Sequence, residues 1–267
     1  MLDKATIDAI ARGFDAAERE RRRMRPPSVQ HEGFSVEDAY AVQRRWVEIK
    51  VAAGNEVKGH KIGLTSRAMQ RQANIDEPDY GALLADMFYE NGSEIPSSRF
   101  IQPRLECELG FVIGTRLEGP GCTIFDVLKA TDYVVPAAEI VDGRTHRVDP
   151  DTGRPRCVLD SIADNAGNAA LIVGGRPVRP MDLDLRWVSV LCQRNNVIEE
   201  SGVAAAVLNH PANGIAWLAN KLAPFDIALE PGQFVLSGSF TSMVEVRAGD
   251  VFHVDFGGLG TISSRFV

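Results

Sequence analysis

Two glutamates separated by a single residue are the first candidates for chemistry in this chain. Glu106 and Glu108 lie in the segment Arg104-Leu-Glu-Cys-Glu-Leu-Gly-Phe-Val-Ile-Gly114. On a β-strand alternate side chains point to the same face, so both carboxylates share one face, about 6–7 Å apart. Gly110 follows on that face and is expected to leave space beside them. The opposite face is apolar and is expected to lie against a core: Leu105, Cys107, Leu109 and Phe111.

A divalent cation would relieve the repulsion between these carboxylates. A third carboxylate, Glu139, interrupts the apolar run Val134-Val-Pro-Ala-Ala-Glu-Ile-Val141, where an unpaired buried charge would be costly. Three carboxylates around a cation such as Mg²⁺ leave a local charge of about −1 and free coordination positions for water or an anionic ligand. The spacing alone also fits an exposed strand edge paired with Lys or Arg, so both interpretations remain open at this point.

Lys61 is the next candidate, in Lys58-Gly-His-Lys-Ile-Gly-Leu-Thr-Ser66. A lysine directed into a partly desolvated site can have a lowered pKa and transfer protons; the alternative is an exposed strand lysine. His60 should point the opposite way and is interpreted as structural. Asp79, within the turn signal Pro-Asp-x-Gly, is either a turn cap or a further carboxylate of the same site.

A turn after a short apolar run offers a possible binding position for the substrate. In Gly238-Ser-Phe-Thr241, backbone N–H groups and the hydroxyl of Ser239 could hold a carboxylate, although a plain turn explains the segment equally well. The sequence contains no G-x-G-x-x-G after a strand, no P-loop, no H-E-x-x-H and no G-x-S-x-G. These absences argue against dinucleotide, nucleotide, zinc-protease and serine-hydrolase sites.

Composition narrows the class of protein further. The formal net charge is −7, from 29 basic and 36 acidic residues, the opposite of what a non-specific nucleic-acid binder needs. The basic run Arg19–Arg25 is interpreted as a solvated helix face or a subunit contact. Four widely spaced cysteines and the lack of a long apolar segment predict a reduced, cytoplasmic protein without a structural zinc site or a membrane span.

The elements that would position these residues fall into two parts. Residues 4–24 and 35–54 have helical apolar spacing, and Ser35 resembles a capping-box residue. They predict an N-terminal helical lobe over residues 1–55. From 56 to 267 the chain reads as a β-rich catalytic domain, with one helix near 210–222. The class is therefore α+β, since helices are too few in the second part for a doubly wound sheet. Strands are expected at 57–63, 104–114, 133–141, 169–173, 185–192, 233–236, 251–256 and 260–267.

Taken in order, these motifs resemble the fumarylacetoacetate hydrolase superfamily, and within it the hydratase/decarboxylase branch. The resemblance rests on the Lys58–Ser66 segment, Glu77-Pro-Asp-Tyr-Gly81, the E-x-E strand with Glu139, and Gly238-Ser-Phe-Thr241. It implies a mixed β-sheet roll with a small N-terminal lobe and a homo-oligomer. It also implies Mg²⁺ or Mn²⁺ on the three glutamates, with Lys61 and Asp79 as catalytic residues.

The function expected from this resemblance is a metal-dependent hydro-lyase of aromatic catabolism. It would add water to a 2-hydroxy-2,4-dienoate or 2-oxo-enoate, with a seven-carbon dioate as the expected substrate. Three alternatives remain: a five-carbon substrate, decarboxylation of a 2-oxo dioate, and a non-catalytic partner subunit that associates with a neighbouring enzyme of the pathway. The carboxylates do not separate hydration from decarboxylation, because both reactions need an enolate to be stabilised.

Overall fold

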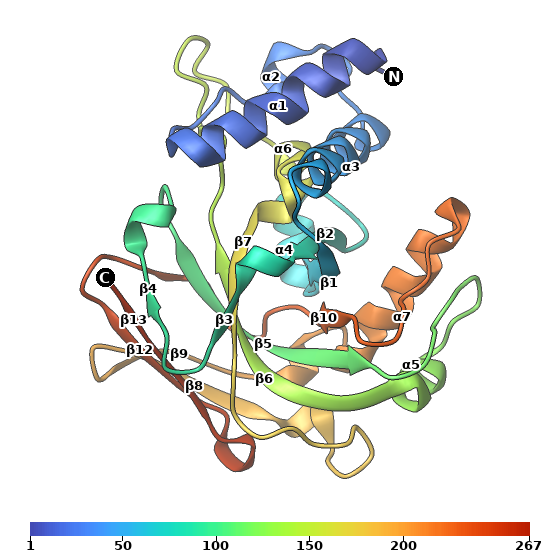
Figure 1. Ribbon diagram of the computed structural model, residues 1–267, viewed down its shortest axis with the longest axis vertical. Coiled ribbons are helices and arrows are strands. Elements are labelled where there is room, and N and C mark those ends of the chain that lie inside the picture. The colour runs from blue at the N-terminus through green and yellow to red at the C-terminus, as the bar shows by residue number, and fades with distance from the viewer.

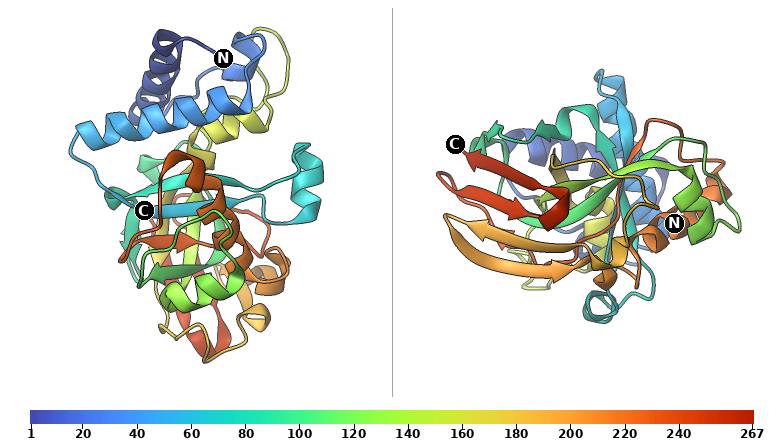
Figure 2. Two further views of the ribbon diagram at one scale, coloured as in Figure 1. Left: turned by 90° about the vertical axis from the view of Figure 1, so that its right-hand side faces the viewer. Right: turned by 90° about the horizontal axis from the view of Figure 1, so that it is seen from below.

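A layer of helices lies at one end of the molecule, against two packed β-sheets. The computed structural model describes residues 1–267. Figure 1 and the left view of Figure 2 show helices α1 and α3 above the sheets, while the C-terminal strands lie at the far side. No helix is long and apolar enough to cross a membrane. The predicted α+β class, with a mixed sheet and a helical N-terminal part, is confirmed.

The N-terminal helices form where the sequence predicts them, with one boundary corrected. They are α1 (Lys4–Glu20), α2 (Pro27–Gln30) and α3 (Val36–Ala52). The capping box before α3 is present, because Ser35 accepts from the backbone of Asp38 while the Asp38 carboxylate accepts from Ser35. Helix α1 ends at Glu20 rather than near residue 24, because Arg21 adopts a left-handed conformation that terminates the helix.

The larger sheet is mixed and carries all the candidate carboxylates. Its strand order is β2-β1-β10-β5-β6-β7-β3, with β11 also paired to β5. The β1–β10 and β3–β7 pairs are parallel, and the other pairs are antiparallel. Its strands are β1 (Val57–Gly63), β2 (Asp79–Leu84), β3 (Phe88–Glu90), β5 (Arg104–Ile113), β6 (Thr131–Val141), β7 (Asn168–Val173), β10 (Phe234–Leu236) and β11 (Val244–Glu245).

The smaller sheet closes the other side of the core. Its order is β4-β13-β12-β8-β9, and the right view of Figure 2 shows its later strands side by side. Its strands are β4 (Glu94–Ile95), β8 (Ser189–Arg194), β9 (Val197–Val203), β12 (Val251–Asp255) and β13 (Thr261–Phe266). The predicted strand over 185–192 is wrong at its start, because Leu185–Trp187 forms a 3₁₀ turn capped by Asp184.

The remaining helices connect or cover the strands. They are α4 (Arg67–Ala73), α5 (Ile124–Ala130), α6 (Val158–Ala163) and α7 (Pro211–Leu222). Helix α4 joins β1 to β2 and projects from the body (Figure 2, left). The helix expected near 210–222 is confirmed as α7. One continuous apolar core joins residues of the N-terminal helices to residues of both sheets, with Trp46 and Phe111 among the large buried side chains. The proposed lobe boundary at 55/56 falls between α3 and β1.

Candidate metal and proton-transfer site

The three glutamates come from two neighbouring antiparallel strands. Glu106 and Glu108 lie on β5, and Glu106 is directly opposite Glu139 on β6. One carboxylate oxygen from each residue lies within 4.8 Å of the others. Glu108 and Glu139 are fully buried, and Glu106 is partly buried. The alternative of an exposed strand edge is therefore wrong, because β5 lies between β10 and β6 in the sheet.

The carboxylates have unused acceptor capacity. Glu108 Oε1 and Glu139 Oε2 are buried without a hydrogen-bond partner, a costly state for an ionised oxygen in a protein interior. A hard divalent cation takes oxygen ligands of this kind, so these residues fit Mg²⁺ or Mn²⁺. The oxygens that do have partners are held firmly: Gly238 N–H donates to Glu108 Oε2 at 2.8 Å, and Asn168 Nδ2 donates to Glu139 Oε1 at 2.8 Å.

Burial and crowded negative charge raise the pKa values of two of the glutamates, Glu106 and Glu108. Burial, reinforced by Glu139, raises the pKa of Glu106 to about 8. The pKa of Glu108 is also raised well above its usual value, by burial and by both neighbouring glutamates. In the absence of a cation, Glu106 therefore retains a proton near neutral pH.

Lys61 and Asp79 lie together on the strands beside the glutamates. Lys61 Nζ is 3.3 Å from Glu139 Oε1. Asp79 is directly opposite Gly63, two residues from Lys61 on β1, and a Cβ atom at Gly63 would lie 2.2 Å from Asp79 Oδ1 and 3.2 Å from Lys61 Nζ. Glycine at this position therefore allows Lys61 and Asp79 to approach one another. The turn-cap interpretation of Asp79 is wrong, since the residue begins strand β2 and is buried.

The pKa expected for Lys61 is corrected in direction. Burial acts to lower the pKa of Lys61, but the charges of Glu139, Asp79, Glu106 and Glu108 outweigh it, and the net shift is upward. Burial raises the pKa of Asp79 to about 6, with Lys61 opposing the shift and Glu139 adding to it. One firmly protonated amine and one carboxyl that titrates near neutrality are thus placed side by side.

The remaining sequence predictions for this region have mixed outcomes. The space expected beside Gly110 is filled, because a Cβ atom there would lie 1.9 Å from the ring of Phe234. Gly238 N–H binds Glu108, and Ser239 Oγ donates to Thr241 O at 2.9 Å. Burial lowers the pKa of His60 to about 4, consistent with a neutral structural side chain.

Sequence reasoning missed Asn168, which contacts Glu139 directly. Its only signal in the sequence is a polar residue at the start of the apolar run Asn168–Val173. That pattern is also common at the edge of an ordinary strand.

Comparison with known proteins identifies the family of this chain. The family model described as "Fumarylacetoacetate (FAA) hydrolase C-terminal" matches residues 49–267. The chain is 60% identical to 2-oxo-hept-4-ene-1,7-dioate hydratase of Escherichia coli, over 100% of both chains. It is 37% identical to 2-hydroxyhexa-2,4-dienoate hydratase of Comamonas testosteroni, over 100% of this chain and 99% of that one.

A solved relative has nearly the same fold. The structure of 4-oxalocrotonate decarboxylase from Pseudomonas putida G7, complexed with magnesium and adipate, has a TM-score of 0.94 and 34% identity, covering 100% of this chain and 99% of that one. The same enzyme has also been solved with calcium and acetate. The family model matches most of this chain, and one relative is 60% identical to it over the full length of both. This chain therefore belongs to the fumarylacetoacetate hydrolase family.

Proposed function

We propose that this chain is a divalent-metal-dependent hydro-lyase that converts 2-oxo-hept-4-ene-1,7-dioate into 4-hydroxy-2-oxoheptane-1,7-dioate. The observation that carries the proposal is the 60% identity to the E. coli hydratase over the whole of both chains. The proximity of the three glutamates, with two unpartnered oxygens among them, supports the metal requirement.

In this proposal Glu106, Glu108 and Glu139 hold the cation, which is Mg²⁺ or Mn²⁺. When bound, it supplies a Lewis acid that stabilises negative charge on the substrate's C2 oxygen. Lys61 and Asp79 carry the protons. Their side chains come from adjacent strands. Gly63 lies opposite Asp79 and two residues from Lys61, and it has no side chain to keep them apart. Both can therefore reach the same region of a bound molecule.

The proton transfers can be followed atom by atom from the dienol form of the substrate. One proton leaves the C2 hydroxyl and one is delivered to C5, which moves the double bond to C3–C4, in conjugation with the C2 carbonyl. The oxygen of water then bonds to C4 while the water gives up one proton, and one proton is delivered to C3. Lys61, protonated before reaction, suits donation, and Asp79, with a pKa of about 6, suits both acceptance and return of a proton.

Further parts of the proposal concern the setting of the enzyme. We propose a cytoplasmic homo-oligomer that acts in the breakdown of aromatic compounds, as the sequence resemblance implies. The proposal includes association with a neighbouring enzyme of the pathway. Ser239 is proposed as a substrate contact, for which its hydroxyl would exchange its bond to Thr241 O for one to the substrate.

Decarboxylation of a 2-oxo dioate is the second candidate. The 0.94 TM-score to a 4-oxalocrotonate decarboxylase favours it, and the same metal and proton chemistry would serve both reactions. A five-carbon hydratase substrate is the remaining variant, since several relatives are named 2-keto-4-pentenoate hydratases.

The deciding experiment follows dienol absorbance for five-carbon and seven-carbon substrates, with and without Mg²⁺, together with product mass. We expect Mg²⁺-dependent turnover that is fastest on the seven-carbon dioate, with a mass gain of one water. Release of CO₂ would establish the decarboxylase instead. Full turnover after exhaustive chelation, or in the Glu106→Gln/Glu108→Gln variant, would refute the metal-dependent mechanism.

A further inference from the structure

Asn168 is a fully buried side chain that lies behind the carboxylates and takes no part in the proton transfers proposed above. It is 0% exposed, and its Nδ2 donates to Glu139 Oε1 at 2.8 Å. Lys61 Nζ approaches the same oxygen at 3.3 Å. Both donors therefore act on Oε1, while Glu139 Oε2 has no protein partner. This one-sided arrangement leaves Oε2 available to a cation.

An irregularity in the sheet gives Asn168 its orientation. On β6 and β7, Ile140 is opposite Ala170 but Val141 is opposite Asn168, so the register shifts by one residue. In a regular ladder Ala169 would oppose Val141, and the Asn168 side chain would point to the other face. The bulge places Asn168 on the same face as Glu139 and Val141. Bulges of this kind occur beside active sites, where they redirect a side chain.

The backbone just before Asn168 is also constrained. Three residues before it have positive φ angles: Asn165 at 52°, Ala166 at 51° and Gly167 at 73°. Such angles in non-glycine residues cost about 1–3 kcal/mol each and persist only where surrounding contacts enforce them. The Asn165 side chain supplies such contacts, because it accepts from Ala82 N–H at 2.7 Å and donates to Ala82 O at 2.9 Å.

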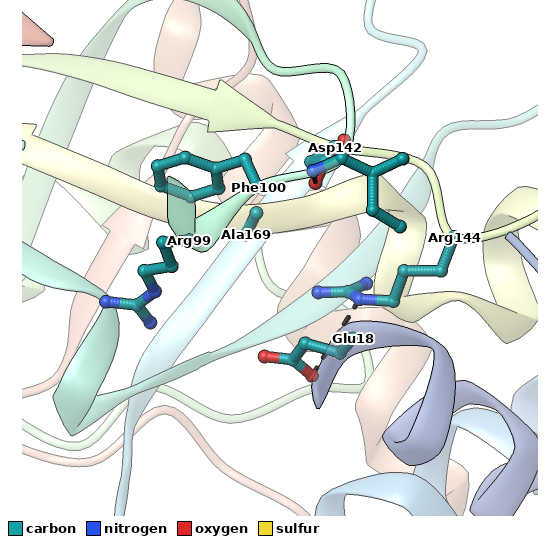
Figure 3. Close-up of a pocket in the computed structure, with 7 residues that line it drawn as sticks. Glu18, Arg99, Phe100, Asp142, Arg144 and Ala169 are labelled. Carbon is teal, nitrogen blue, oxygen red and sulfur yellow. Dashed lines mark hydrogen bonds and ion pairs between the residues drawn. The ribbon is translucent and has the colours of Figure 1, made fainter. Parts of the chain in front are cut away.

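A buried arginine anchors the carbonyl of Asn168. Arg144 Nη2 donates to Asn168 O at 2.9 Å, and Nη1 donates to Asp164 Oδ1 at 2.8 Å. Figure 3 shows this arginine beside Glu18 of helix α1, with their ion pair at 3.8 Å. Arg144 also lies 5.3 Å from the ring centre of Trp46 on helix α3. The support for Asn168 thus extends from the metal strands to the N-terminal helices.

We propose that Asn168 is a positioning residue that fixes the Glu139 carboxylate for metal binding, an inference that rests on the metal site of the proposed function. Its amide restrains rotation of the carboxylate by holding Oε1, so that Oε2 stays directed to the cation. Residues that orient metal ligands in this way typically contribute about 10–100-fold to metal affinity.

The test measures binding of Mn²⁺ alone, by electron paramagnetic resonance and calorimetry, with no substrate present. Asn168→Ala removes the amide and leaves a cavity, whereas Asn168→Leu removes the amide and largely keeps the volume. Gln43→Leu is the matched control: Gln43 is another buried amide that donates to Tyr80 O and Ile162 O, both at 2.8 Å, and it does not contact the glutamates. Thermal denaturation of every variant accompanies the binding measurement.

We expect the Mn²⁺ Kd to rise about 10–100-fold in both Asn168 variants and to change less than threefold in Gln43→Leu, although all three lose thermal stability. An unchanged Kd in either folded Asn168 variant would overturn the positioning role. An equal rise in Gln43→Leu would do the same, because the effect would then follow general destabilisation. Failure of the wild-type chain to bind Mn²⁺ would instead refute the metal site of the proposed function.

Discussion

Divalent-metal binding should displace protons from the glutamates, and the size of this effect follows from their acidities. Burial and the charge of Glu139 raise the pKa of Glu106 to about 8, and the pKa of Glu108 is also raised. A carboxyl must be ionised to coordinate a cation. The experiment is therefore a titration of metal-free protein with Mg²⁺ at a series of pH values from 6 to 9.

The expected slope can be calculated from the number of protons displaced. At pH 7 a group of pKa about 8 is roughly 90% protonated, so Glu106 alone gives up nearly one proton when the cation binds. Each displaced proton makes the Kd fall about tenfold per pH unit below the pKa, equivalent to about 1.4 kcal/mol. Between pH 6 and 7.5 the Kd should fall about 30-fold if one proton leaves, and more if Glu108 also gives one up. The fall should level off above pH 8.

Isothermal calorimetry in buffers of different ionisation enthalpy measures the released protons directly. In the Glu106→Gln variant the slope should decrease by about one proton, along with a loss of affinity. A Kd that changes less than threefold between pH 6 and 7.5 in the wild-type chain, with no buffer-dependent heat, would refute the reasoning. It would mean that the glutamates are already ionised before the cation binds.

Three further predictions concern the support of the site. Gly63→Ala should lower kcat by about 100-fold through displacement of Asp79, because the added Cβ would lie 2.2 Å from Asp79 Oδ1. Gly258→Ala has open space around its Cβ and should leave kcat unchanged in the same steady-state assay. Asp164→Asn should cost about 3–5 kcal/mol in denaturant unfolding, because it removes the fully buried partner of Arg144 and leaves only the more distant Glu18 to balance its charge. Ser35→Ala should cost only about 1 kcal/mol through loss of the helix cap, and an unchanged kcat would separate this stability effect from catalysis.

Strand alternation predicted correctly which residues share a face where the sheet is regular. Glu106 and Glu108 share a face of β5 because nothing interrupts the ladder between them and β6. The N-terminal helices were predictable for a similar reason, since their apolar spacing and the Ser35 capping box are local signals. In each case the residue pattern and the tertiary packing favour the same structure.

The features that the sequence did not predict depend on contacts between distant segments. The bulge that turns Asn168 toward Glu139 arises from pairing between β6 and β7. Phe234 fills the space beside Gly110 from a strand more than a hundred residues away. The Asp79 segment contains turn-forming residues, yet pairing with β1 makes it a strand. Local propensity is overridden in these places by tertiary structure.

The upward pKa shift of Lys61 also has a consequence for how the site operates. Burial is the largest single influence on this lysine, and it acts to lower the pKa; the surrounding carboxylates reverse its effect. A cation would bring two positive charges but displace about one proton from Glu106, so the negative potential at Nζ would be reduced by about one charge, and by less if Glu108 also gives up a proton. The pKa of Lys61 would then move down from its raised value, which would make its ammonium group a better proton donor. Metal binding and the pKa of Lys61 are therefore linked through the charge of the site. Loss of a metal ligand should impair proton transfer even where substrate still binds.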